Sequence, residues 1–174
     1  YRPVTREWRF AEHQYDYVFE MDADFSHAPD DLPRLYDKCA NEGYDVAIGS
    51  RYVSGVNVVN WPMGRVLMSY FASKYVRFVT GLPIHDTTAG FKCYRRQVLE
   101  TIELEKIKFK GYAFQIEMKF TAYQCGFQIA EVPVIFVNRE LGTSKMNSSI
   151  FGEAFFGVMQ LKWDSWFRKY PQKK

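Results

Sequence analysis

Two aspartates, Asp22 and Asp24, follow a short hydrophobic stretch, 18–21. Alternate residues of an extended segment point to the same side, so the two carboxylates are expected to lie together. Paired carboxylates repel each other and favour a cation between them. A hard divalent ion such as Mg²⁺ binds one or two carboxylates together with substrate phosphates. The spacing therefore indicates that Asp22 and Asp24 are ligands for a metal ion that holds a diphosphate.

Other interpretations of this pair stay open. Two acids separated by one residue also occur in solvated turns and helix caps. His27 is a candidate third ligand, although a histidine in a surface loop is the more frequent arrangement. Aspartyl-phosphate hydrolases and phosphatases also end a strand in this pattern, with one Asp as the nucleophile. That class needs a further acidic pair, and the loop 85–90 offers one acid.

Four cationic residues lie near predicted strand ends or helix starts. Arg51 follows a strand, Arg65 lies in the first turn of a helix, and Arg139 and Lys145 follow the last strand. Open α/β sheets bind ligands beyond the carboxyl ends of their strands, and the planar fork of arginine suits phosphate oxygens. An isolated arginine is usually a solvated surface charge. We nevertheless expect these four side chains to share one cavity beside the two aspartates.

Strands that alternate with helices are expected to position these residues in an α/β fold. Strands are predicted to end near Met21 and Ser50 and to cover 91–94 and 128–140, and helices to cover 32–39, 62–81, 112–125 and 148–170 and to begin near Arg96. Asn60 and Pro62 are expected to cap and open the second helix, and Gly81 and Gly126 to end theirs. Pro133 indicates an edge strand or a bulge.

The composition indicates one globular domain. Of the 174 residues, 47% are hydrophobic and 25% are charged. The net charge of +3 does not argue for nucleic acid, but it suits a protein near acidic headgroups. The three widely spaced cysteines indicate neither a zinc site nor a disulfide framework, which favours a reducing cytosol. No apolar run is long enough for a transmembrane helix.

Several motifs together resemble a known family: "FEMDADFSHAPDDLPRL", "VAIGSRYVSG", "NWPMGRVLMSYFASKYVRFVTGLPIHDTTAGFKCYRR", "GYAFQIEM" and "VPVIFVNRELGTSKM". They are similar to dolichol-phosphate (polyprenol-phosphate) mannosyltransferases of glycosyltransferase family 2, over about 12–162. The resemblance implies a GT-A fold, which is a Rossmann-like sheet. It also implies inverting transfer of mannose from GDP-mannose to a polyprenyl (dolichyl) phosphate, with Mg²⁺ or Mn²⁺.

The resemblance also implies roles for individual residues. Asp24, Asp86 and Arg139 are the expected catalytic residues, and Asp22 and Asp24 the expected metal–diphosphate ligands. Asp86 would position the sugar or act as a weak base, although an aspartate before threonine often bonds its own backbone. The acceptor phosphate is expected to contact a set of five residues: Arg51, Arg65, Arg139, Ser144 and Lys145. Its oxygen is already anionic, so the reaction has little need of a strong base.

The chain departs from the family at its start. Residues 1–14 are atypical, and a strand with a "P-T-Y-N-E"-like motif and the following nucleotide-base-binding stretch are not recognised. We therefore expect a partial GT-A catalytic domain over 1–174, inactive alone and prone to associate through an open sheet edge. The alternatives are a polyprenyl-phosphate glucosyltransferase that uses UDP-glucose, or a non-catalytic remnant that binds the acceptor.

The last helix, 148–170, is rich in aromatic residues and carries basic residues near its end. It is expected either to be a buried packing helix or to lie at a membrane interface. A polyprenyl acceptor favours the second interpretation. The expected location is peripheral, on the cytoplasmic face of a membrane, with a membrane-anchoring protein as a further partner.

Overall fold

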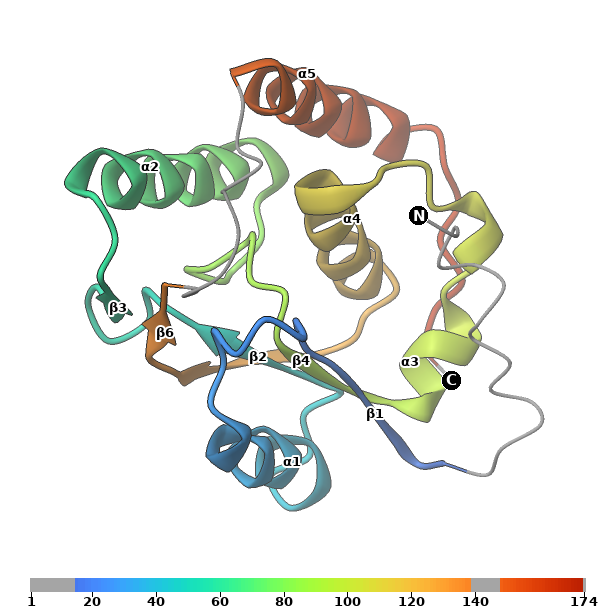
Figure 1. Cartoon of the computed structure of the whole chain (residues 1–174). Coiled ribbons are helices and arrows are strands. Elements are labelled where there is room, and N and C mark those ends of the chain that lie inside the picture. The colour runs from blue at the N-terminus through green and yellow to red at the C-terminus, as the bar shows by residue number, and fades with distance from the viewer. Residues whose placement is uncertain (1–14, 139–147, 174) are drawn as a thin grey trace.

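The computed structural model describes residues 15–138 and 148–173 (Figure 1). Its main sheet has the strand order β1-β4-β2-β5. The strands are β1 (Tyr17–Glu20), β2 (Val46–Ser50), β4 (Lys92–Arg95) and β5 (Ile129–Pro133). Strand β4 is antiparallel to β1 and β2, whereas β2 and β5 are parallel. A second, small sheet pairs β3 (Val58–Val59) with β6 (Phe136–Val137). The chain therefore has the mixed α/β architecture that the sequence predicts.

The described residues form five α-helices. They are α1 (Leu32–Ala40), α2 (Met63–Thr80), α3 (Arg96–Thr101), α4 (Gly111–Gln124) and α5 (Ser148–Ser165), and two 3-10 turns lie at Pro29–Asp31 and Leu104–Lys106. Figure 1 shows α1 on one face of the sheet and α2, α4 and α5 on the other. Among the described helices, none is both long and apolar enough to cross a membrane.

Strand β2 is buried along its whole length because helices pack on both of its faces. Val46 and Ile48 contact the core cluster that includes residues of α2, α4 and α5. Ala47 points the other way, into the cluster that contains Leu35 and Cys39 of α1. This alternation is the period of two that a strand imposes on its side chains. It aims the end of β2, and Arg51 after it, at one edge of the sheet.

Gly49 in β2 has no room for a side chain. A Cβ atom there would lie 2.9 Å from Cδ1 of Phe91 and 3.1 Å from Cγ2 of Val134. Phe91 is fully buried and Val134 nearly so, so neither can move aside easily. Glycine is therefore required at this position by packing.

Several predicted boundaries are confirmed, and others differ. Gly81 ends α2 with φ 78°, and Gly126 has φ 86° after α4. Pro133 is the last residue of β5, an edge strand. The capping prediction for α2 is wrong, because Pro62 is the N-cap residue and no side chain caps the helix. The last helix ends at Ser165 rather than at residue 170.

The segment after α5 returns to the start of β2. The backbone N–H of Lys173 donates to the carbonyl of Cys125 at 2.8 Å. The ammonium of Lys173 contacts both carboxylate oxygens of Asp45 at 2.8 Å. Asp45 is fully buried and also accepts the N–H of Gln128. Tyr170 packs against the core on the way.

Candidate active site

Asp22 and Asp24 lie immediately after the carboxyl end of β1, as the sequence predicts. The Asp22 side chain is 58% exposed. The backbone of Gly90 lies beside it, since a Cβ atom on Gly90 would be 3.5 Å from Oδ2 of Asp22. Gly90 does not have a positive φ, so a tight turn is not what requires glycine there. The loop that ends at Gly90 therefore meets the first of the two acids.

A tight turn follows Asp24. Its Oδ1 atom accepts hydrogen bonds from both the N–H, at 3.1 Å, and the hydroxyl of Ser26. Phe25 between them has φ 59°, which is uncommon for a residue other than glycine. The Phe25 side chain is 97% exposed. Asp24 therefore stabilises a turn, and its place at the end of β1 is also compatible with binding a metal ion.

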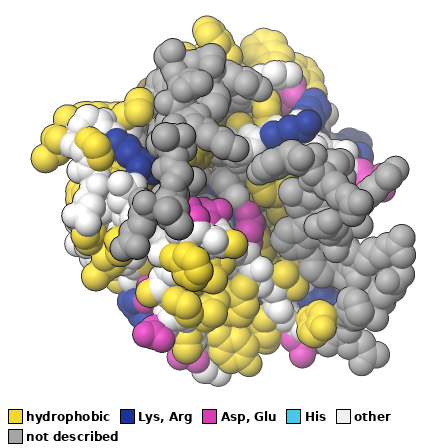
Figure 2. All heavy atoms as spheres, in the orientation of Figure 1, with side chains coloured by type: hydrophobic (Ala, Val, Ile, Leu, Met, Phe, Trp, Pro, Cys, Tyr) yellow, Lys and Arg dark blue, Asp and Glu magenta, His cyan; other side chains and the backbone are white. Residues whose placement is uncertain are grey.

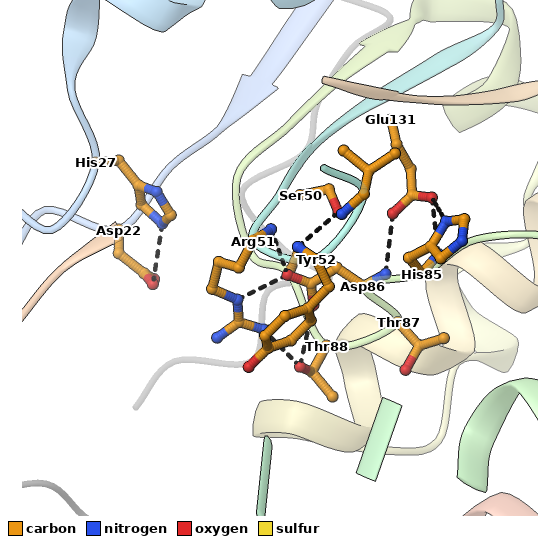
Figure 3. Close-up of polar contacts among 12 residues, drawn as sticks. Asp22, His27, Ser50, Arg51, Tyr52, His85, Asp86, Thr87, Thr88 and Glu131 are labelled. Carbon is orange, nitrogen blue, oxygen red and sulfur yellow. Dashed lines mark hydrogen bonds and ion pairs between the residues drawn. The ribbon is translucent and has the colours of Figure 1, made fainter. Parts of the chain in front are cut away.

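His27 is buried, in contrast to the surface loop position that histidines more often take. Its ring lies 5.0 Å from the rings of both Phe91 and Phe136. Its Nε2 atom is 3.9 Å from Oδ2 of Asp22 (Figure 3). Burial lowers the pKa of His27, and the charge of Asp22 opposes this only in part. The imidazole is therefore neutral near pH 7 and faces the first acid.

Within the described part of the chain, no three His, Cys, Asp or Glu side chains are grouped as metal ligands. Asp22 and Asp24 thus offer carboxylate oxygens without a third such ligand. This donor set suits a hard divalent ion whose remaining ligands are phosphate oxygens or water.

Arg51 and Asp86 form a buried ion pair between the end of β2 and the loop before β4 (Figure 3). Nε and Nη2 of Arg51 donate to the two carboxylate oxygens at 2.7 Å, and the Arg51 backbone N–H donates at 2.9 Å. Nη2 also donates to the hydroxyl of Thr88 at 2.7 Å. Burial alone would raise the pKa of Asp86, but Arg51 holds it below its usual value. Both groups are charged at neutral pH.

This geometry changes the interpretation of Asp86. Its carboxylate bonds a residue 35 positions away rather than its own backbone. It is fully buried, and both of its oxygens accept hydrogen bonds from Arg51. What the structure shows is a carboxylate that orients Arg51, and direct contact of Asp86 with a sugar stays a prediction.

Arg65 lies near Arg51, with the indole of Trp61 close to both. The Arg65 guanidinium carbon is 3.8 Å from the centre of the Trp61 ring, and that of Arg51 is 5.6 Å from it. Nη1 of Arg65 donates to Oδ1 of Asn138 at 3.0 Å. Trp61 also contacts Phe136, the ring that contacts His27. One aromatic cluster therefore connects the two arginines to the region of the acids.

Three further predicted site residues, Arg139, Ser144 and Lys145, lie outside the described residues, as does the segment 1–14. Their place in the predicted cavity stays a prediction. Asn138, which immediately precedes Arg139, is described and bonds Arg65.

Two buried side chains hold the loop that carries Asp86. Glu131 of β5 accepts the N–H groups of His85, at 2.7 Å, and of Asp86, at 2.9 Å. Lys119 of α4 donates to the carbonyls of Thr87, at 2.8 Å, and Ala89, at 2.7 Å. Burial, together with the nearby charge of Lys92, lowers the pKa of Lys119 well below its usual value.

Another buried polar group lies behind the acids. Lys92 of β4 pairs with Glu20 of β1 at 2.9 Å and bonds Gln115 of α4, whose amide donates to Glu20. Gln115 thus supports β1 just before Asp22. Glu117, farther along α4, has a separate set of contacts. It accepts the N–H groups of Lys108 and Phe109, each at 2.9 Å, from the segment that precedes the helix.

Sequence reasoning missed three residues that organise this site: Trp61, Lys119 and Glu131. The sequence does contain a signal for Lys119. It lies in a stretch of α4 whose apolar residues face several sides of the helix: Ile116, Met118, Phe120 and Ala122. A lysine in such a run needs buried acceptors. No sequence signal pairs Arg51 with Asp86.

The chain matches the sequence profile of the family described as "Glycosyl transferase family 2" over residues 6–103. It is 51% identical over 146 residues to the polyprenol monophosphomannose synthase of Mycolicibacterium smegmatis, covering 84% of this chain and 55% of that protein. It is 48% identical over 147 residues to the undecaprenyl-phosphate mannosyltransferase of Micrococcus luteus, covering 84% and 60%. The chain thus spans somewhat more than half the length of these relatives.

Solved structures with the same fold include the glucosyl-3-phosphoglycerate synthase of Mycobacterium tuberculosis. Its complex with phosphoglyceric acid has a TM-score of 0.58 and 15% identity, covering 88% of this chain and 50% of that one. Its complex with Mn²⁺, UDP-glucose and glycerol 3-phosphate has a TM-score of 0.57 and 17% identity, covering 88% and 50%. At this identity the likeness establishes the GT-A fold alone.

Proposed function

Because the chain belongs to glycosyltransferase family 2, we propose that its protein transfers mannose from GDP-mannose to a polyprenyl (dolichyl) phosphate with inversion. The names of the two relatives support the mannosyl group and the polyprenyl acceptor. The observation that carries the proposal is the convergence of Asp22, His27, Arg51 and Arg65 around shared aromatic rings. Acids for a metal–diphosphate and arginines for a phosphate then lie in one region.

Asp22 and Asp24 would hold Mg²⁺ or Mn²⁺ on the donor side. The solved relative with Mn²⁺ and UDP-glucose supports a divalent ion in this fold. A bound metal neutralises negative charge that develops on the leaving nucleoside diphosphate. The residues of this chain supply the carboxylate oxygens, and the adjacent Gly90 leaves Asp22 open on that side.

Arg51 and Arg65 would bind the acceptor phosphate, together with Arg139, Ser144 and Lys145. Arg51 is held in one orientation by Asp86, so less conformational freedom is lost when it contacts phosphate. The indole Nε1 of Trp61 has no hydrogen-bond partner among the described residues, which leaves a donor beside both arginines. An oriented phosphate oxygen can attack the anomeric carbon without first losing a proton to a strong base.

A transfer assay with the complete protein tests this proposal, with GDP-mannose and UDP-glucose compared as donors. Asp24→Asn should lower kcat by about 100-fold or more, since a metal ligand contributes several kcal/mol to charge stabilisation. Asn keeps the oxygen that Ser26 bonds, so the fold should persist. Asp30→Asn, at an exposed carboxylate in the next turn, is the matched control.

Each result has a distinct meaning. Near-normal turnover of Asp24→Asn would reject the metal role. Transfer from UDP-glucose in place of GDP-mannose would reassign the donor. Acceptor binding without transfer from either donor would favour a non-catalytic remnant.

We also propose that α2 and α5 bring the protein to the cytoplasmic face of a membrane. The two helices pack together, with Tyr75 stacked on Phe155 at 4.3 Å. Their outer surfaces expose large hydrophobic side chains, and Figure 2 shows hydrophobic side chains along the upper part of the molecule, where Figure 1 places these helices. The exposed residues are Met63, Leu67, Phe71 and Phe78 of α2, and Phe156, Met159 and Trp163 of α5.

The basic residues of α2 and the state of the cysteines support this location. The exposed Lys74 and the half-buried Arg77 lie among the α2 residues, which suits anionic headgroups. Trp and Phe next to basic residues are typical of interfacial helices. All three cysteines are free and buried, which fits a reducing compartment.

A further inference from the structure

Lys119 is a fully buried lysine whose nitrogen contacts the loop that carries Asp86. Its two bonds go to the carbonyls of Thr87 and Ala89, on either side of Thr88. The hydroxyl of Thr88 accepts a hydrogen bond from Nη2 of Arg51. Lys119 therefore fixes the carbonyl groups of the two residues that flank Thr88, a hydrogen-bond partner of Arg51, although it does not touch Arg51 itself.

The same loop is held at its other end by Glu131. Its carboxylate accepts N–H groups at the start of the loop, whereas Lys119 donates to carbonyls near the end. A buried acceptor, Glu131, thereby bonds the N–H groups at one end of the loop, and a buried donor, Lys119, bonds the carbonyls at the other. Such groups are costly to leave unpaired in an interior. The loop between them consequently has one well-defined conformation.

The number of acceptors fits the chemistry of this amine. The pKa of Lys119 is lowered chiefly by burial and next by Lys92. The nitrogen of Lys119 donates to two carbonyl oxygens, and both an amine and an ammonium can donate these two bonds. The side chain can therefore hold the loop in either protonation state.

We propose that Lys119 is a positioning residue for the acceptor phosphate. It holds the carbonyls of Thr87 and Ala89, and thereby places the hydroxyl of Thr88 that bonds the guanidinium of Arg51. This inference rests on the proposed function, because it assigns Arg51 to the acceptor. It predicts that losing the two Lys119 bonds weakens acceptor use without weakening donor use.

The test compares two variants in the complete protein with a detergent-solubilised polyprenyl phosphate. Lys119→Met keeps an unbranched side chain without donors, and Lys119→Gln restores two N–H donors on a shorter side chain. Lys162→Met is the matched control, since Lys162 of α5 also bonds a carbonyl, that of Thr80, at 3.4 Å. Steady-state KM values for acceptor and donor, and amide hydrogen exchange of residues 86–90, are measured for each.

Lys119→Met should raise the acceptor KM about tenfold, equivalent to about 1.4 kcal/mol, and leave the donor KM within about twofold. Its 86–90 amides should exchange at least tenfold faster, and Lys119→Gln should recover part of both changes. A merely structural role would lower the fraction of active protein and hence kcat, with both KM values unchanged. Equal loss in Lys162→Met, or unchanged KM and exchange in Lys119→Met, would overturn the proposal.

Two complications leave the test decisive. If Lys119→Met does not fold, Thr88→Val decides, since it removes the hydroxyl that accepts from Nη2 of Arg51 in a side chain of similar shape. An unchanged acceptor KM in that folded variant would reject positioning through Thr88. If the unsubstituted protein shows no transfer, the proposed function fails, whereas the exchange rates still report whether Lys119 holds the loop. Unchanged exchange in that case rejects the inference as well.

Discussion

Asp86 shows how a residue that resembles a catalytic acid can act through a neighbour. Its carboxylate is fully buried and accepts three hydrogen bonds from Arg51. A group in this state is ionised, but it is poorly placed to accept a proton from a ligand. Its charge instead fixes the direction of the guanidinium, which has a separate face toward Trp61.

The ion pair gives a pH prediction with a definite sign. The folded-state pKa of Asp86 lies below its ordinary value of 3.8, so the pair stabilises the fold above that pH. The contribution is lost as the pH falls through the lowered pKa. Asp86→Asn should reduce the free energy of unfolding by about 3 kcal/mol near neutral pH, because it breaks a buried pair.

Urea unfolding of the protein and of Asp86→Asn at a series of pH values checks this prediction. The difference between the two should be constant above about pH 5 and shrink below about pH 4. Asp30→Asn, at an exposed aspartate, should follow the unsubstituted protein throughout. A difference that stays constant down to about pH 2 would show that Asp86 does not contribute through its charge.

At the scale of elements, the sequence predicts much of the architecture and little of its long-range pairing. The apolar spacing of 62–81 and the glycine after it predict α2 and its end, because both signals are local. Strand β3 has two residues, too short for periodicity to reveal. The predicted strand 128–140 is divided into β5 and β6, and β6 pairs with β3 in the second sheet. The acids after β1 were predicted from their spacing, whereas the Arg51–Asp86 pair depends on how separate loops meet.

The C-terminal segment gives a prediction at this scale. The ammonium group of Lys173 contacts both carboxylate oxygens of the buried Asp45. Lys173→Met should destabilise the fold by about 1–2 kcal/mol, since it leaves a buried carboxylate with fewer donors. Thermal unfolding measures this, with Lys169→Met, at an exposed lysine nearby, as the control. Equal melting temperatures for the two variants would show that the contact contributes nothing to stability.

At the scale of the whole molecule, two packed helices from distant parts of the sequence, α2 and α5, each expose large hydrophobic side chains. Helix α1 lies on the opposite face of the sheet (Figure 1). Clusters of large exposed hydrophobic side chains often mark a surface that contacts a membrane or another protein. The net charge of +3 adds attraction to anionic lipid.

Vesicle sedimentation tests this membrane surface. The protein should bind phosphatidylcholine vesicles that contain about one-third phosphatidylserine, and bind less to phosphatidylcholine alone. Replacing both Phe78 and Trp163 by Ser should weaken binding at least tenfold, because two large exposed side chains no longer enter the interface. Tyr36→Ser, on α1, should have no effect. Equal binding by all three proteins would place the membrane contact elsewhere.

Gly49 and Arg51 stand two positions apart in one short motif, yet they would be retained for unrelated reasons over evolution. Any side chain at Gly49 collides with Phe91 and Val134, whereas the guanidinium of Arg51 pairs with the buried carboxylate of Asp86. A homologue that has abandoned transfer should therefore keep the glycine, and should lose the arginine only together with Asp86. A sequence search that scores the whole motif will therefore count homologues that no longer transfer a sugar as active enzymes.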